Sequence, residues 1–412
     1  MNNNRQLFWA GTYAATLYWL LSEMFTPILS LYVSDLGFSV FQIAIIFAAQ
    51  TFVPFLFTIQ IGYIADRIGQ HNMLAVGAGF MILGSTLLLL SDHYFAFIAT
   101  QTLVGLGHIA VWLSSQSIVT FVGDGSREKA IARMSFFTAI GQLAGPLFGG
   151  FIYDQFNFKW VFITYTILSF ALLAVYAMLP RKRENQSEVN ERQSVPVAKP
   201  RFSMIGTYNA GLKLYASNRG IQAGAMISFS LAFILFIRVS YLPIYLKEQS
   251  YNTTEIGLWI ALWSLASILI RPFTARFIES FGRYPTTGAA LFMSVIGLMG
   301  FSLFPGQVGL IVSLVLVGLG TGLNQPLAIS LISSATDKRN RGLGTGLRLM
   351  SNRLANWVCP LAIGATSYFV GLGASFVVVS LPLAAVSMFS MKVLGHLAVS
   401  KVTTPKKGVE SV

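Results

Sequence analysis

The sequence predicts an all-α integral membrane protein with 12 transmembrane helices in two pseudo-symmetric six-helix bundles. Hydrophobic residues make up 54% of the chain and charged residues only 10%, whereas soluble domains carry about 25% charged residues. The apolar residues form blocks of roughly 20, long enough to cross a hydrocarbon core of about 30 Å. Open sheets and lipid-exposed loops leave backbone groups unsatisfied in such a core, so the composition predicts a bundle of helices.

Twelve apolar segments are predicted as spans. The first begins near Phe8 and is too long for the core of a signal peptide. The spans are expected near residues 8–33, 42–64, 72–91, 94–122, 131–152, 160–179, 220–246, 255–277, 285–304, 309–335, 342–369 and 373–393.

The distribution of basic residues orients these spans with both termini in the cytoplasm. Of the 28 Lys and Arg residues, only Lys159 and Lys247 fall in the predicted outside loops. Arg238, Arg348 and Arg353 fall within spans, and the other 23 lie in inside segments or toward the inside ends of spans. An excess of positive charge in cytoplasmic segments is the rule for membrane proteins, and it explains the net charge of +13 better than nucleic-acid binding does.

Composition divides the chain into four parts. An N-terminal bundle is predicted over residues 1–180 and a C-terminal bundle over 220–395, with a cytoplasmic tail over 396–412. The segment 181–219 begins with a charged stretch that is nearly free of aromatics, so a cytoplasmic linker is expected there. Within it, the stretch from Phe202 to Ala216 is expected to form an amphipathic helix at the membrane surface.

A duplication is visible at an offset of about 213 residues. It pairs Gly105 and Gly107 with Gly318 and Gly320; Gly62, Asp66 and Gly69 with Ala275, Glu279 and Gly282; and, at an offset of 214, Pro146 and Gly150 with Pro360 and Gly364. Two similar six-span halves joined by a polar linker are typical of secondary transporters, whose binding site lies near the middle of the membrane.

Several function classes lack their sequence signals. The single cysteine, Cys359, allows no internal disulfide and no cysteine metal cluster, so no metal site is predicted. No phosphate-binding loop of the form G-x-x-x-x-G-K-[ST] occurs, which argues against an ATP-driven pump and leaves no cofactor to expect. No nucleophile and base are paired within the spans, so an enzyme is not expected.

One acidic residue, Glu23, lies deep within a predicted span. A charge at the bilayer centre costs at least about 2.5–3.5 kcal/mol and therefore indicates a function. Glu23 shares one helical stripe with Thr12, Thr16, Trp19, Pro27 and Ser30, a pattern expected of a cavity wall. Removal from water favours the protonated form of a carboxyl group, so Glu23 is a candidate for proton coupling. The alternative is a structural glutamate paired with an arginine.

Further polar residues are candidates for the same cavity. Arg238 lies at a similar depth in the second half and is expected either to pair with Glu23 or to bind an anionic group. His108 is the only histidine within a span and is a second candidate for proton coupling, against a hydrogen-bonded structural role. The other predicted cavity residues are Gln101, Trp112, Tyr241, Asn324, Gln325, Arg353 and Asn356.

Two motifs resemble those of the major facilitator superfamily. After the second span the chain reads Gly62-x-x-x-Asp66-Arg67-x-Gly69, although Gln70 and His71 replace the usual basic pair. By resemblance, Gly62, Asp66, Arg67 and Gly69 form a conformational latch with Glu279, where a structural turn is the alternative. The fifth span carries Gly141, Gly145, Pro146, Gly149 and Gly150, which is similar to the motif of the superfamily's exporters and antiporters.

The resemblance implies a transporter of the drug or metabolite:proton antiporter branch. The expected activity is proton-coupled export of a small amphipathic compound by a monomer, in contact with membrane lipid, in a bacterial inner membrane. An exporter of an anionic metabolite or siderophore, and a proton-coupled uptake symporter, are the alternatives. A non-transporting receptor or assembly factor with the same fold is less consistent with the polar residues of the spans.

Overall fold

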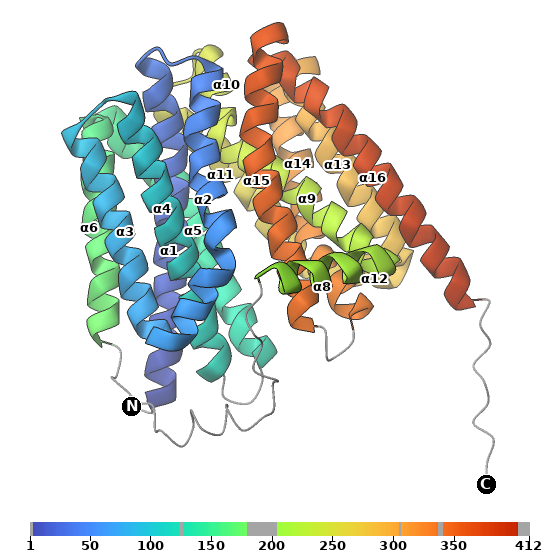
Figure 1. Cartoon of the computed structure of the whole chain (residues 1–412). Coiled ribbons are helices and arrows are strands. Elements are labelled where there is room, and N and C mark those ends of the chain that lie inside the picture. Colours follow the sequence, from blue (N-terminus) through green and yellow to red (C-terminus); the bar gives the residue numbers. More distant parts are fainter. Residues whose placement is uncertain (1–2, 123–126, 179–203, 305, 337–340, 403–412) are drawn as a thin grey trace. The chain divides into compact units, whose positions relative to one another are not determined.

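The computed structural model describes residues 3–122, 127–178, 204–304, 306–336 and 341–402. Every regular element in these ranges is a helix (Figure 1). The first half contains α1 (Asn3–Asp35), α2 (Val40–Ile68), α3 (Gln70–Leu90), α4 (Tyr94–Val122), α5 (Arg127–Phe156) and α6 (Phe158–Met178). The rest of the chain contains α8 (Met204–Ser217), α9 (Arg219–Ser240), α10 (Leu242–Glu248), α11 (Thr253–Ile270), the 3₁₀ turn η1 (Arg271–Phe273), α12 (Thr274–Phe281), α13 (Arg283–Leu303), α14 (Gly306–Ala335), α15 (Arg341–Val370) and α16 (Leu372–Val402).

Ten helical segments of the described chain are long and apolar enough to cross a membrane. Neither α1 nor α15 is among them. Each of these two helices carries a charged side chain that the sequence assigned to a cavity, Glu23 on α1 and Arg353 on α15. Their lower apolar content is therefore expected if they face protein rather than lipid along much of their length.

Two predicted spans are confirmed as segments long enough to cross a membrane, but the structure interrupts each of them. The span expected over 220–246 ends as α9 at Ser240, and α10 begins at Leu242 with Pro243 in its first turn. The span expected over 255–277 is divided into α11, η1 and α12, with Pro272 in η1. A proline removes one intrahelical hydrogen bond and its ring clashes with the preceding turn, which accounts for both interruptions.

The predicted amphipathic helix of the linker is present as α8, which lies crosswise to α15 (Figure 1). The charged first part of the linker, residues 179–203, lies outside the described residues. At the other end, α16 continues to Val402, beyond the predicted start of the tail at residue 396.

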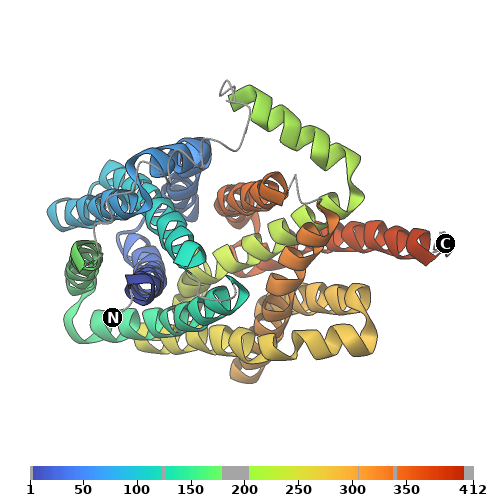
Figure 2. The same cartoon turned by 90° about the horizontal axis from the view of Figure 1, so that it is seen from below.

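The chain forms two compact units. Unit 1 comprises Met1–Tyr208 and Arg238–Ala261, and unit 2 comprises Asn209–Ile237 and Leu262–Val412. In unit 1, α1 packs against α2, α4, α5 and α6, and the view along the helices shows it between them (Figure 2). The short segment Arg238–Ala261 belongs to the second half of the repeat but packs with the first, where α10 contacts α1.

In unit 2, α13 packs against α14 and α16, and α15 contacts the same two helices. A cluster of buried apolar side chains joins α9, α13, α14 and α16, and includes Ile227, Leu291, Leu331 and Val393.

The sequence duplication is reproduced in the contacts of its glycines. Gly107 lies against Gly77 and Met81 on α3, and Gly320 lies against Ala290 and Ser294 on α13. The contact residues correspond as the glycines do, since Ala290 and Ser294 follow Gly77 and Met81 by the same 213 positions. Gly84 and Gly297 likewise contact Thr100 and Ser313 of the following helix.

The turns that follow α2 and α12 also correspond. Gly69 has φ +87° and Gly282 has φ +84°, values that glycine adopts readily and other residues rarely do. The two halves therefore share both their helix contacts and a turn conformation.

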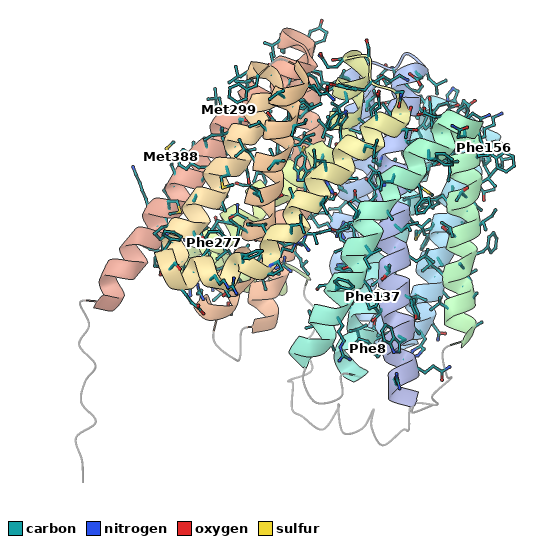
Figure 3. All side chains as sticks on the ribbon, turned by 180° about the vertical axis from the view of Figure 1, so that it is seen from behind. Phe8, Phe137, Phe156, Phe277, Met299 and Met388 are labelled. Carbon is teal, nitrogen blue, oxygen red and sulfur yellow. The ribbon has the colours of Figure 1, made fainter. Side chains whose placement is uncertain are left out.

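Large apolar side chains cover the outer surfaces of both units, as a lipid-facing surface requires (Figure 3). Phe156 on α5 is 58% exposed and Met388 on α16 is 50% exposed. The buried residues gather between the helices of each unit.

We expect Gly107→Ala to lower the stability of the folded protein by about 1–3 kcal/mol, because the added carbon overpacks the contact between α3 and α4. A Cβ atom at this position would lie 2.7 Å from the Gly77 carbonyl oxygen. Thermal unfolding of the detergent-solubilised protein measures the change. Gly79→Ala is the matched control, since nothing lies within 4 Å of its added carbon. Equal transition temperatures for the two variants would contradict the packing argument.

Candidate functional site

The centre of unit 1 contains a buried ion pair between Glu23 on α1 and Arg238 at the end of α9. The Arg238 Nη2 group donates a hydrogen bond to Glu23 Oε1. Glu23 is 2% exposed and Arg238 is 6% exposed. Among the described buried side chains of unit 1, these two carry the formal charges. The structure thus joins the two residues that the sequence placed at similar depth.

A glycine stripe on α5 allows α1 to approach closely at the ion pair. A Cβ atom on Gly141 would lie 2.5 Å from the Thr16 carbonyl oxygen, and one on Gly149 would lie 2.9 Å from the Met24 carbonyl oxygen. On Gly145 it would lie 2.7 Å from the Cβ atom of Glu23. Residues spaced by four lie on one helical face. This stripe therefore fixes the position of the Glu23 Cβ atom against α5.

The remaining residues of the predicted fifth-span motif face α11. A Cβ atom on Gly150 would lie 2.5 Å from the Thr253 carbonyl oxygen, and one on Gly257 would lie 2.5 Å from the carbonyl oxygen of Pro146. Small residues on both helices permit backbone-to-backbone contact. The motif therefore holds α5 against α1 on one face and against the segment Arg238–Ala261 on another.

An aromatic cluster lies beside the ion pair along α1 and α4. Tyr18 stacks on Trp112 with ring centroids 5.5 Å apart, and Trp19 meets Trp112 edge-to-face at 5.6 Å. Tyr18 also contacts the His108 ring edge-to-face at 5.1 Å. The His108 Nε2 atom and the Tyr165 hydroxyl are hydrogen-bonded at 3.1 Å. His108 is therefore held in place by an aromatic contact and a hydrogen bond.

Several buried polar atoms of this region have no hydrogen-bond partner in the structure. They are the Trp19 Nε1 donor, the Glu23 Oε2 acceptor, and both polar atoms of the Gln101 amide. A buried polar group without a partner costs about 1–3 kcal/mol. Such atoms are expected where a ligand or an ordered water supplies the missing bonds.

The end of unit 1 that contains α10 is held by a second group of polar contacts. Asp35 at the end of α1 accepts hydrogen bonds from the Lys247 ammonium group and from the Tyr153 hydroxyl, the latter at 2.7 Å. Asp154 on α5 accepts bonds from the backbone N–H and the hydroxyl of Thr254, both at 2.6 Å. Together these contacts fasten α10 and the start of α11 to α1 and α5.

The other predicted cavity residues occupy separate positions. In unit 1, the Thr16 hydroxyl donates to the carbonyl of Thr12 in its own helix at 2.8 Å, and Tyr241 is buried at the start of α10. Asn324 and Gln325 lie on α14, and Arg353 and Asn356 on α15, all in unit 2. Asn324 is buried, and its Oδ1 atom has no partner among the described residues.

The predicted latch is described only in part. The surroundings of Gly62 and the side chain of Asp66 are outside what the structure describes. Arg67 in the last turn of α2 and Glu279 on α12 are exposed. Gly69 adopts the left-handed conformation that the tight turn requires. The pairing of these residues as a latch stays a prediction.

Sequence reasoning missed five residues of this region. Tyr18 and Tyr165 carry no pattern that distinguishes them from other apolar-facing tyrosines, and Tyr165 is 57 positions from its partner. Asp35 and Asp154 lie just beyond the ends of predicted spans, where charged residues are common. Lys247 offered a signal, since it is one of two basic residues in the predicted outside loops.

No group of three His, Cys, Asp or Glu side chains that would hold a metal ion occurs among the described residues. Cys359 is buried in unit 2, and its thiol contacts the Phe233 carbonyl oxygen at 3.5 Å. The chemistry of the site therefore rests on the ion pair, the aromatic cluster and the unbonded polar atoms.

Comparison with known proteins decides the family. A family model described as the Major Facilitator Superfamily matches residues 12–360 and 248–410. The chain belongs to the Major Facilitator Superfamily. It is accordingly a multi-pass integral membrane transporter with the two-bundle fold of that superfamily, as the sequence predicted.

Among its relatives, the chain is 26% identical over 373 residues to the multidrug resistance protein MdtG of Escherichia fergusonii, a match that covers 85% of each protein. It is 22% identical over 380 residues to the multidrug efflux protein YfmO of Bacillus subtilis, covering 88% of this chain and 91% of that protein. A shorter match, 27% over 163 residues, relates it to the vesicular acetylcholine transporter of Torpedo marmorata and spans 38% of this chain and 31% of that protein.

Solved structures of superfamily members share the fold. The nucleoside transporter NupG superposes with a TM-score of 0.76 at 12% identity, covering 94% of this chain and 99% of that one. A bacterial homologue of the human lysosomal transporter Spinster, in an inward-facing and unoccupied conformation, superposes with a TM-score of 0.73 at 13% identity, covering 95% and 98%.

We expect the Glu23 and Arg238 substitutions to be non-additive. Arg238→Met alone leaves the carboxylate buried without its partner and should destabilise unit 1 by about 3–5 kcal/mol, whereas replacing both residues removes both charges and should cost much less. Thermal unfolding of Arg238→Met, Glu23→Gln and the double variant provides the cycle. A double variant as unstable as the sum of the single variants would show that the pair is energetically uncoupled.

Proposed function

We propose that this transporter exports a small amphipathic compound in exchange for protons across a bacterial inner membrane, with both termini in the cytoplasm. The observation that carries the proposal is the buried pair of Glu23 and Arg238, in which Glu23 Oε2 has no hydrogen-bond partner in the structure. A membrane-buried carboxylate with an unused acceptor can bind a proton.

In this mechanism the proton and the substrate compete for one oxygen atom. A proton that binds Glu23 Oε2 converts the carboxylate to a neutral carboxyl group, so the attraction that holds Arg238 is lost. The segment Arg238–Ala261, which packs against α1 and α5, then loses the buried ion pair, one of the contacts that hold it to them. Deprotonation restores the pair, and this two-state element supplies the alternation between facing states.

Two observations favour export over uptake. The fifth-span residues that resemble the exporter motif are all used in close contacts, with Gly145 against Glu23 and Gly150 against Thr253. The two relatives that match along most of their length are described as multidrug resistance and multidrug efflux proteins. The proposed transporter acts as a monomer in contact with membrane lipid.

The proposal is tested with purified protein in liposomes that contain a pH dye. In wild type, addition of a transported compound should move protons across the membrane. In Glu23→Gln this proton movement should fall at least about tenfold, because an amide cannot take up a proton in this range. Glu248→Gln, which changes an exposed carboxylate at the end of α10, is the control and should behave as wild type.

Other results would redirect the mechanism. Unchanged proton movement in Glu23→Gln would transfer coupling to His108 or another group. Substrate flux without proton movement would indicate a uniporter or another coupling ion. Accumulation of the compound in energised cells, in place of extrusion, would identify a symporter.

A further prediction concerns the polar contacts at the end of unit 1 that contains α10. Alternating access requires α11 to separate from α5, so a disulfide between Asp154→Cys and Thr254→Cys should stop transport. The two native side chains are in direct hydrogen-bond contact at 2.6 Å. Substrate flux should be lost on oxidation and restored by a reductant, while the Asp154→Cys variant alone should not respond. Full activity in the cross-linked double variant would contradict separation at this point.

A further inference from the structure

The unbonded atoms beside the ion pair identify a substrate class. We infer that the transported compound is electrically neutral and planar, and that it carries a hydroxyl or amide group which accepts from Trp19 Nε1 and donates to Glu23 Oε2. This inference rests on the proposed function, since it names the ligand of the same site.

The first step concerns the two unbonded atoms. Trp19 and Glu23 are four residues apart on α1 and so lie on the same face of the helix, with Cβ atoms about 5–6 Å apart. The indole Nε1 offers only a donor and the carboxylate Oε2 only an acceptor. Both atoms are buried, and no hydrogen bond joins them. A single group that accepts and donates at once, such as a hydroxyl or an amide, satisfies both.

The second step concerns charge. Glu23 already has the Arg238 guanidinium as its partner. A charged ligand at this site would add a third buried charge to a pair that is neutral as a whole. Among the described buried side chains of unit 1 no other formal charge is present to balance it, which is strongly unfavourable. A neutral ligand leaves the pair intact. His108, the other titratable group nearby, is engaged with Tyr165.

The third step concerns shape. The side chains of Trp19 and Trp112 are only partly buried, although their rings contact one another edge-to-face. Both rings therefore keep accessible surface, and the Trp19 ring itself carries one of the unbonded atoms. Aromatic faces and edges bind planar aromatic groups by stacking or edge contact. A planar ring with one polar edge fits this combination.

Equilibrium dialysis with the purified protein in detergent tests the inference without requiring transport. Four probes are compared in mildly acidic buffer: umbelliferone, which is a neutral hydroxycoumarin; its methyl ether, which lacks the donor; the planar cation ethidium; and the planar anion naphthoate. Umbelliferone should bind about five- to tenfold more tightly than its methyl ether, since the ether leaves Glu23 Oε2 unbonded. Both ions should bind more weakly than umbelliferone.

A variant separates the polar contact from the ring contact. Trp19→Phe keeps an aromatic ring but removes the indole N–H, so it should weaken umbelliferone binding about fivefold. Trp160→Phe, at an exposed tryptophan of α6, is the control and should have no effect. The thermal transition of each variant verifies that it is folded. The comparison of the four probes uses the wild-type protein, so it does not depend on any variant being folded.

Three results would overturn the inference. Tighter binding of ethidium or naphthoate would mean that the site selects a charge. Equal binding of umbelliferone and its ether, or no effect of Trp19→Phe, would mean that water alone satisfies the two atoms. Absence of binding by all four compounds would also reject it. Because dialysis measures no proton movement, the binding pattern can hold even if proton-coupled export fails in liposomes, and the reverse.

Discussion

The pairing of Glu23 with Arg238 is the interaction on which the arrangement of unit 1 depends. An isolated charge is not tolerated in a buried membrane environment, and breaking a buried pair is far more costly than never having built it. Arg238 belongs to the second half of the repeat, yet it packs with the first half through this bond. The ionisation of one carboxylate is thereby connected to the position of a whole chain segment, Arg238–Ala261.

Glycine makes that pairing geometrically possible. Gly145 has no side chain, and any carbon placed there would meet the Cβ atom of Glu23 at 2.7 Å. Glycine also permits close helix contacts at Gly107 and Gly320, which occupy corresponding positions of the two halves. Because apolar side chains gain little by leaving lipid for one another, close backbone packing is a main source of helix association in membranes. The repeat therefore preserves the close helix contacts, even where the contacting residues differ between the two halves.

Much of the fold could be predicted because its signals are local. Apolar runs located the spans, and glycines at an offset of 213 residues located contacts that the structure contains, such as those of Gly107 and Gly320. The interruptions at Tyr241 and at η1 were not predicted, since a proline within an apolar run is compatible with a kinked helix as well as with a break. The hydrogen bond between His108 and Tyr165 could not be predicted, because nothing in either residue's neighbourhood indicates a partner on another helix.

The polar residues of the site also explain which helices look least like membrane spans. In unit 1, α1 is the long helix whose apolar content is too low for it to be recognised as a membrane span. It is also the helix that packs against α2, α4, α5 and α6. A helix surrounded by protein need not be apolar all round, so it can carry Thr12, Trp19 and Glu23 on one stripe. Low hydropathy in α1 is thus a consequence of its enclosed position. That position allows the polar stripe to meet the aromatic side chains of α4, where a planar ligand with a polar edge would find both kinds of contact.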